Sequence, residues 1–219
     1  MRGTLYVVAT PIGNLEDITQ RALRVLREVD LIAAEDTRRT RVLLEHYQIE
    51  NALTSLYEHN EAAKAAALIR QLEEGANIAL VSEAGTPLIS DPGYRLIQLA
   101  IVREITIVPI PGPSALIAAL VVSGLPVDAF IFEGFLPKRP GKRRRRLEAL
   151  KHEERTLIVY ESPRRVSALL EEMLAAWGDR HVAVARELTK KFEEVLRGTI
   201  TQVHAHLAEH PPLGEVTLV

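Results

Sequence analysis

The residues best suited to chemistry lie in loops that directly follow apolar segments of the chain. Glu35, Asp36 and Arg38 follow one such segment and bring two carboxylates and a guanidinium together. The segment Ser82–Gly93 follows another and is rich in glycine and proline, which leaves backbone N–H and C=O groups free to bind a ligand. Charged groups on loops at strand ends are more often functional than decorative. These two loops are therefore the first candidates for a binding site.

Four loops share this pattern, and they are Thr10–Asn14, Glu35–Arg38, Ser82–Gly93 and Pro109–Ser114. For any one loop, a simpler interpretation stays open, in which proline and glycine only turn the chain between a strand and a helix. If the strands are parallel, however, all four loops lie at the same edge of one sheet, where open α/β sheets bind their ligands. Their convergence favours a binding site over four unrelated turns.

A second concentration of charge lies in the segment Lys138–Arg146, which holds seven cations in nine residues. The formal net charge of the chain is −2, so any contact with nucleic acid requires a local basic patch of this kind. The alternative is a solvated loop that begins a helix. Arginines near a helix N-terminus oppose the helix dipole, so helix stability does not explain them. We expect this segment to contact RNA phosphates.

The elements that position these loops alternate between strand and helix. In the first half we expect strands at 5–9, 31–34, near 53, 78–81 and 105–110, and helices after residue 17, after 38, and at 61–72, 94–102 and 114–122. Asp17 and Gln20 are expected to form a capping box at the start of the first helix. This alternation predicts a doubly wound, mostly parallel sheet in a domain spanning residues 1–124.

After Gly124 the strict alternation of expected strands and helices ends. The expected strands are 130–132, 156–160, 181–185, 193–197 and 215–219, and the expected helices are 166–177 and 199–208. We predict a second α/β domain with a mixed sheet over residues 125–219.

Composition excludes several classes of function. Without cysteine there can be no disulfide, thiolate nucleophile or thiolate metal site. His206 and His210 are spaced as metal ligands on a helix could be, but no further ligands accompany them, so we expect no metal.

Neither G-x-G-x-x-G after the first strand nor a P-loop is present, which disfavours dehydrogenases and P-loop NTPases. No signal peptide is visible, and the longest apolar stretch, Ala115–Val122, is far shorter than a membrane span. We expect a soluble, cytoplasmic protein.

The four loops together resemble the tetrapyrrole methylase superfamily, the class III S-adenosylmethionine-dependent methyltransferases. The later segments Glu133–Pro137, Tyr160–Ser162 and Ala185–Lys190 narrow the resemblance to members that methylate the 2′-hydroxyl of a decoding-centre cytidine in 16S rRNA. The resemblance runs from Leu5 to Val219. It implies S-adenosylmethionine as cofactor, bound in a cleft between two α/β domains, with 16S rRNA in the 30S subunit as substrate, no DNA partner, and a homodimer.

The resemblance also implies site residues. Those implied for the cofactor are Pro11, Ser82, Glu83, Ala84, Gly85, Thr86, Leu88, Ile89, Ser114, Ala115, Tyr160, Glu161, Ala185 and Leu188. Apart from the resemblance, the cations expected to bind RNA phosphates are those of the basic segment and two arginines near the expected cleft, namely Arg38, Lys138, Arg139, Lys142, Arg143, Arg144, Arg145, Arg146 and Arg186. Asp36, Glu187 and Lys190 are the candidates for assisting loss of the hydroxyl proton. Asp36 and Glu187 could instead be structural partners of Arg38 and Arg186.

Two features depart from the family pattern. Glu83 stands where the family usually has aspartate, and the small helical region that usually follows the last strand is expected to be missing. Two other functions also stay open. One is a methyltransferase of the same fold that acts on a tetrapyrrole or another small molecule, and the other is a ribosome assembly factor without catalytic activity.

Overall fold

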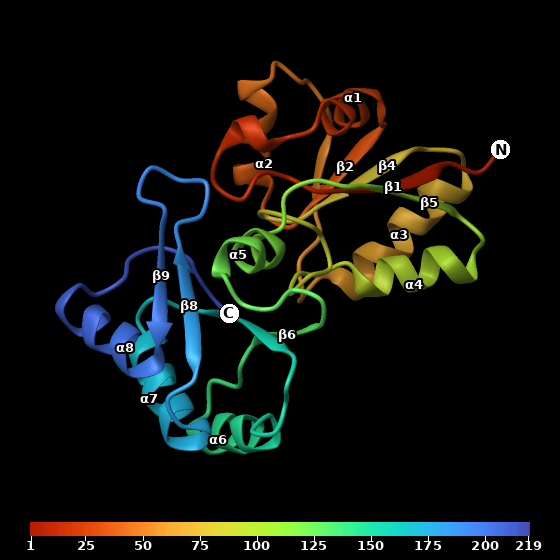
Figure 1. The fold of residues 1–219 in the computed structure, drawn as a ribbon. Helices are drawn as coiled ribbons and strands as arrows, with labels where there is room; N and C mark the ends of the chain where they lie inside the picture. The colour runs from red at the N-terminus through yellow and green to blue at the C-terminus, as the bar shows by residue number, and fades with distance from the viewer. The chain divides into compact units, whose positions relative to one another are not determined.

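A computed structural model describes residues 1–219 and divides the chain into two compact α/β units, Met1–Ser114 and Ala115–Val219 (Figure 1). We expected the division at residue 124. The difference concerns helix α5 (Ala115–Ser123), whose buried residues Leu116, Ala119 and Leu120 pack against strands of the second unit. An apolar helix sequence does not reveal which sheet the helix will cover, so this assignment requires the tertiary structure.

The first unit is built on a five-stranded sheet with the order β3-β2-β4-β1-β5, in which every pairing is parallel. Its elements are β1 (Thr4–Val8), a 3-10 helix η1 (Leu15–Asp17), α1 (Gln20–Glu28), β2 (Leu31–Ala34), α2 (Thr37–His46), β3 (Leu53–Ser55), α3 (Glu61–Glu73), β4 (Ile78–Val81), α4 (Tyr94–Val102) and β5 (Thr106–Ile110). The predicted alternation and the parallel sheet are confirmed.

Both faces of this sheet are covered by helices. Successive residues of the central strand β4 alternate between the two faces, so Ala79 and Val81 pack with α1 and α2, whereas Ile78 and Leu80 pack with α3 and α4. All four residues of β4 are buried. A strand buried on both faces reads as a continuous apolar run, which explains why the sequence shows no alternation there.

The start of α1 differs from the prediction. Asp17 lies in the 3-10 helix η1, whose N-cap is Asn14. The chain is extended at Ile18 and Thr19, and the Thr19 hydroxyl accepts a hydrogen bond from the Ala22 backbone N–H at 3.1 Å. Thr19 is therefore the N-cap of α1, because the short 3-10 turn separates Asp17 from the helix.

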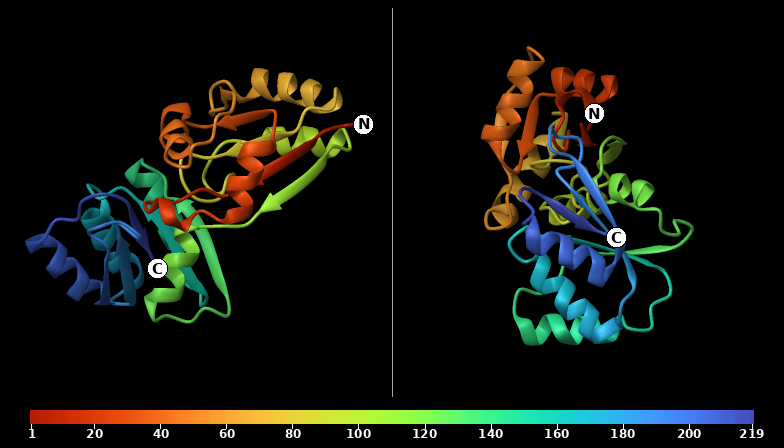
Figure 2. Two further views of the ribbon diagram at one scale, coloured as in Figure 1. Left: turned by 90° about the horizontal axis from the view of Figure 1, so that it is seen from above. Right: turned by 60° about the vertical axis from the view of Figure 1, so that its left-hand side comes forward.

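The second unit contains a mixed sheet with the order β6-β7-β10-β8-β9, in which only the β6–β7 pairing is parallel. After α5, its elements are β6 (Phe130–Phe135), α6 (Pro140–Ala149), β7 (Thr156–Glu161), α7 (Val166–Trp177), β8 (His181–Arg186), β9 (Glu194–Thr199), α8 (Ile200–Glu209) and β10 (Val216–Leu218). Helices α6, α7 and α8 cover one face and α5 covers the other (Figure 2). The predicted mixed sheet is confirmed, and helix α6 begins inside the basic segment.

None of the helices combines the length and the apolar character that crossing a membrane requires.

Candidate functional site

The loops after β1 and β4 meet because these two strands are neighbours in the first sheet. The backbone N–H groups of Thr10 and Gly85 each donate to the other residue's carbonyl oxygen at 2.9 Å. A Cβ on Gly85 would lie 3.3 Å from Cγ2 of Ile12, and Gly85 also adopts a φ of +78°. Glycine at this position therefore lets the two loops approach closely.

The other two loops join them through single hydrogen bonds. The Thr86 hydroxyl donates to the Pro113 carbonyl at 3.1 Å, and the Glu83 N–H donates to Oε2 of Glu35 at 3.1 Å. All four predicted loops thus lie together at the carboxyl edge of the parallel sheet, as the strand alternation predicted.

The loop Ser82–Gly93 is held in a strained conformation. Leu88 and Ser90 have φ values of +75° and +70°, a region that non-glycine residues rarely adopt. Strain of this kind costs about 1–3 kcal/mol per residue and concentrates at functional sites. The buried Ser82 hydroxyl donates to the carbonyls of Ala84 and Gly85 at 3.2 and 3.4 Å, which braces the loop from inside. Ile89 is partly exposed at its surface.

One buried polar atom in this region has no partner within the protein. Thr10 is 4% exposed, and its buried Oγ1 forms no hydrogen bond with any protein group. Buried hydroxyls are normally hydrogen-bonded. An unpaired hydroxyl where two loops meet therefore favours a site in which a polar ligand supplies the missing hydrogen-bond partner. Pro11 follows directly, and Ser114 ends the first unit just before Ala115 begins α5.

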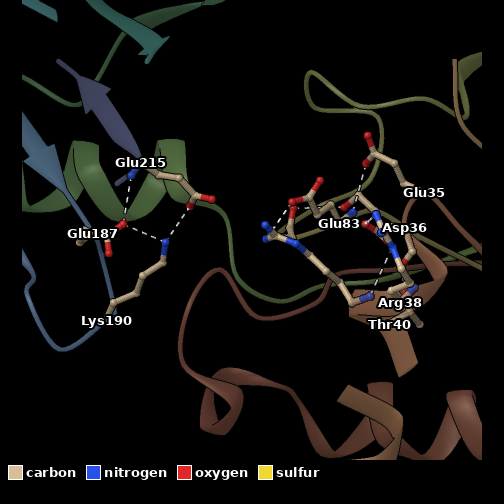
Figure 3. Close-up of polar contacts among 11 residues, drawn as sticks. Glu35, Asp36, Arg38, Thr40, Glu83, Glu187, Lys190 and Glu215 are labelled. Carbon is tan, nitrogen blue, oxygen red and sulfur yellow. Dashed lines mark hydrogen bonds and ion pairs between the residues drawn. The ribbon is translucent and has the colours of Figure 1, made fainter. Parts of the chain in front are cut away.

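Asp36 is the N-cap of helix α2. Its Oδ1 accepts from the N–H groups of Arg38 and Arg39 at 2.8 and 3.4 Å, and the Arg38 guanidinium lies 3.3 Å from Oδ2 (Figure 3). The hydrogen bond from the Arg38 side chain is the main cause of a lowered pKa for Asp36. Because a lowered pKa makes a weaker base, these contacts favour a positioning role for Asp36.

Two other carboxylates at this edge have the opposite character. Burial raises the pKa of Glu35. For Asp91, burial and the nearby negative charge of Glu35 raise the pKa to about 7, although a hydrogen bond with Ser82 acts in the opposite direction and lowers it. A carboxylate with a pKa near neutrality can exchange a proton under physiological conditions. Sequence reasoning included Asp91 only as part of the glycine-rich loop, because its burial cannot be read from its neighbours in the chain.

In the second unit, Tyr160 anchors the start of α5. Its hydroxyl accepts from the Leu116 N–H at 3.0 Å, and its ring makes edge contacts with Phe132 and Phe135, at centroid distances of 4.9 and 5.7 Å. Ala185 is buried in β8 nearby in the same hydrophobic cluster, against which Leu188 packs. The structure therefore brings together three of the five residues predicted in this unit for the cofactor, and a fourth, Ala115, begins α5 directly before Leu116.

The fifth predicted residue, Glu161, uses its side chain elsewhere. Its side chain is 1% exposed, and Oε1 accepts from the Ser162 N–H at 2.6 Å and from Arg165 Nε at 2.7 Å. These bonds close the turn between β7 and α7. The carboxylate of Glu161 is thus committed to the local fold, although its backbone can still line a site.

Glu187 and Lys190 belong to a separate ion-pair cluster in the loop after β8. Lys190 Nζ lies 2.9 Å from Oε1 of Glu187 and 3.2 Å from Oε2 of Glu215, and the Glu215 N–H donates to Glu187 Oε1 at 3.0 Å (Figure 3). The hydrogen bond from Lys190 lowers the pKa of Glu187. Burial lowers the pKa of Lys190, but the carboxylates of Glu187 and Glu215 outweigh this effect and raise it overall. Both groups are therefore held in their charged forms.

The basic segment divides into paired and free cations. Arg143 is buried and bonded to Glu172, and Arg146 forms two hydrogen bonds with Glu133 at 2.7 and 2.5 Å. The exposed members without an ion pair are Lys138, Arg139, Lys142, Arg144 and Arg145. Sequence reasoning assigned all seven to RNA, but the buried guanidinium of Arg143 is not accessible to a phosphate.

The two remaining predicted RNA contacts also differ from each other. The Arg38 side chain is 91% exposed beside its partner Asp36. Arg186, at the end of β8, is largely covered, and its Nε donates to Oε2 of Glu194 at 2.6 Å. Arg38 is therefore the more accessible of the two.

Comparisons with known proteins agree with this architecture. Residues 4–204 match the family model described as tetrapyrrole (corrin/porphyrin) methylases. A protein of Halalkalibacterium halodurans called ribosomal RNA small subunit methyltransferase I is 52% identical over 218 residues, which cover 100% of this chain and 75% of that protein. Proteins of the same name from Thermotoga maritima and Escherichia coli O157:H7 are 50% and 51% identical, and the chain covers 97% and 77% of them.

Solved structures with low sequence identity share the fold. A uroporphyrin-III C-methyltransferase from Thermus thermophilus superimposes with a TM-score of 0.69 at 22% identity, covering 100% of this chain and 94% of that one. A structure of that enzyme type from the same organism, complexed with S-adenosyl homocysteine, gives 0.67 at 18% identity, covering 99% and 96%.

Proposed function

The chain belongs to the tetrapyrrole methylase family, and from this premise we propose that it is an S-adenosylmethionine-dependent methyltransferase acting on RNA of the small ribosomal subunit. The observation that carries the proposal is identity of about half over essentially the full chain to proteins named for that activity. The free cations of the basic segment support an RNA substrate, because they provide local positive charge on a chain whose net charge is −2.

The first unit offers groups that fit the cofactor. The methionine end of S-adenosylmethionine carries an ammonium and a carboxylate. These groups suit the backbone N–H and C=O groups of the loops around Gly85 and Thr86, and the unpaired hydroxyl of Thr10. Ile89 and Leu88 supply apolar surface suited to adenine. The further proposed contacts are Pro11, Ser82, Glu83, Ala84, Ser114, Ala115, Tyr160, the backbone of Glu161, Ala185 and Leu188.

When bound, S-adenosylmethionine supplies a methyl group on a sulfonium, which makes it electrophilic. The protein must hold the attacking oxygen in line and exclude water, and positioning of this kind can supply much of the rate. The hydroxyl must also lose its proton. Asp91 is the carboxylate best suited to accept it, since its pKa is about 7. Asp36, Glu187 and Lys190 are proposed to position the reacting groups through their fixed ion pairs.

More specifically, we take the acceptor to be the 2′-hydroxyl of a decoding-centre cytidine in 16S rRNA, which places the protein in the bacterial cytoplasm. The free cations of the basic segment, together with Arg38, would bind the surrounding phosphates.

The test is methyl transfer from labelled S-adenosylmethionine to purified 30S subunits, followed by mapping of the modified nucleotide. We expect label in 16S rRNA at one cytidine, in a linkage that resists alkaline hydrolysis because its 2′-oxygen is methylated. Label transferred to a tetrapyrrole and not to 30S subunits would replace the RNA substrate with a small molecule. If calorimetry detects no binding of S-adenosylmethionine, the proposal that the protein is a methyltransferase is contradicted, and a role as a ribosome assembly factor is favoured.

A further inference from the structure

The loop between β8 and β9, residues 187–193, is held in a conformation that its sequence does not favour. Glu187 and Thr189 have φ values of +51° and +68°, although neither is glycine. Non-glycine residues persist in this region only where surrounding contacts impose it. The conformation of this loop is therefore imposed by its anchors.

Those anchors are numerous for so short a segment. Lys190 joins Glu187 to Glu215, as described above, and the Thr189 N–H donates to Oε2 of Glu193 at 2.5 Å. The backbone of Glu187 is also held, since its N–H donates to the carbonyl of Glu215, the residue before β10, at 3.0 Å. These contacts hold the base of the loop on both sides.

An apolar contact fixes the loop from within. Leu188 packs against the cluster formed by α5 and the sheet, which also contacts Tyr160. Both residues are among those proposed for the cofactor, so the loop emerges directly beside that part of the proposed site.

The tip of this fixed loop presents an aromatic ring and a cation to solvent. Phe192 is 64% exposed and belongs to none of the hydrophobic clusters of the protein. Lys191 is exposed, has no ion pair, and places Nζ 5.6 Å from the centre of the Phe192 ring. A single exposed apolar residue is common on protein surfaces. An aromatic ring carried on a strained and heavily anchored loop is a different case, because the anchors fix its position without burying it.

We propose that Phe192 and Lys191 form a stacking platform for an unpaired nucleotide of the RNA substrate, close to the nucleotide that receives the methyl group. The proposal rests on the proposed function. Proteins recognise unpaired bases by stacking them on exposed aromatic rings, and a neighbouring cation binds the adjoining phosphate. A platform held in place before binding loses little conformational freedom when RNA arrives.

The experiment compares Phe192→Ala, Phe192→Leu, Phe192→Trp and Lys191→Gln in methyl transfer to 30S subunits. Val102→Ala is the control, because Val102 is also an exposed apolar residue, 74% exposed, at the end of α4 in the other unit. We expect KM for 30S subunits to rise about 5- to 150-fold in Phe192→Ala, corresponding to the loss of one stacked base. Phe192→Leu should resemble Phe192→Ala, whereas Phe192→Trp should retain the wild-type KM. Lys191→Gln should raise KM and weaken its dependence on salt.

A second measurement does not depend on activity. In Phe192→Trp, a single-stranded RNA oligonucleotide of the target sequence should quench the fluorescence of the added indole, and calorimetry should give unchanged affinity for S-adenosylmethionine in every variant. Wild-type KM in Phe192→Ala, or equal values in Phe192→Leu and Phe192→Trp, would overturn the platform. So would a change of oligomeric state in Phe192→Ala, which would assign the ring to a contact between copies of the chain. If wild-type protein itself fails to methylate 30S subunits, the proposed function fails first, so the two failures are distinguishable.

Discussion

Arg143 of helix α6 donates two parallel hydrogen bonds to Glu172 of helix α7, from Nε to Oε2 at 2.8 Å and from Nη2 to Oε1 at 2.6 Å. The Arg143 side chain is 9% exposed and that of Glu172 is 23% exposed. This pair fixes one face of α6 against α7, while the free cations of the helix face the solvent. The basic segment is thus anchored by one of its own arginines.

Replacing Arg143 should affect stability first. Arg143→Ala leaves the Glu172 carboxylate partly buried without its partner. We expect a loss of about 2–3 kcal/mol in the free energy of unfolding, less than for a fully buried pair because water reaches part of Glu172. Thermal unfolding followed by circular dichroism measures this loss. Arg145→Ala, which removes an exposed arginine of the same helix, should change stability by less than about 0.5 kcal/mol. Equal losses in both variants would contradict the division of the segment into paired and free cations.

The free cations should instead control the salt dependence of RNA binding. In Arg145→Ala and Lys142→Ala, a plot of log affinity for 16S rRNA against log salt concentration should become shallower by about 0.7–0.9 for each phosphate that the variant no longer neutralises. Filter binding between low and physiological salt gives these slopes. Arg70→Ala, which removes an exposed arginine from α3 of the first unit, is the control and should leave the slope unchanged.

Asp91 should make stability depend on pH. Its pKa is about 7 in the folded protein, against an ordinary value of 3.8. Between these values the unfolded chain releases the proton while the folded chain retains it. The folded state therefore loses stability as the pH rises from about 4 to about 7, and no more is lost above that. Asp91→Asn should remove this decline.

The expected difference is about 1–2 kcal/mol, smaller than the full shift would give, because Asp91 is partly exposed and water screens its charge. Denaturant unfolding at several pH values from 4 to 8 measures it. Asp128→Asn, at an exposed position, is the control. If the wild type and Asp91→Asn show the same pH dependence, the perturbed carboxylate at this edge of the sheet is not Asp91.

Asp36 and Glu187 should influence turnover more than cofactor binding. Each is held by a neighbouring cation, so its removal releases Arg38 or Lys190 from a fixed position. In Asp36→Ala and Glu187→Ala we expect kcat to fall roughly ten-fold or more, with little change in affinity for S-adenosylmethionine. Steady-state kinetics and calorimetry separate the two effects, and the exposed Glu50→Ala serves as control. Unchanged kcat in both variants would exclude them from the reaction.

Gly214 should be required for the structure of the β8–β9 loop. A Cβ at this position would lie 1.9 Å from Oε1 of Glu187, so Gly214→Ala must displace that carboxylate from Lys190 and Glu215. Gly178 offers a matched control, because its φ of +77° is close to the +79° of Gly214 but nothing lies within 4 Å of the added atom. Both variants carry the backbone cost of about 1–2 kcal/mol. Only Gly214→Ala should also speed proteolysis within residues 187–193.

The sequence determined the architecture of this protein because apolar runs and turn residues are local signals. The alternation of strands and helices specified two α/β units, and the apolar run Ile78–Val81 predicted the strand that the structure shows as β4. In a parallel sheet, all strands present their carboxyl ends at one edge. The convergence of the four loops therefore followed from the order of the elements alone.

Tertiary structure decided what each side chain does. Arg143 and Arg145 are two residues apart on one helix, yet one is buried against Glu172 and the other is free. Sequence spacing does not show which face of α6 meets α7. Asp36 and Asp91 are likewise both aspartates in loops that follow strands, and the sequence does not distinguish their acidity. In the structure, hydrogen bonds from Arg38 lower the pKa of Asp36, whereas burial raises the pKa of Asp91. Burial and the pairing of charges depend on residues far apart in the chain, and only the folded structure brings these together.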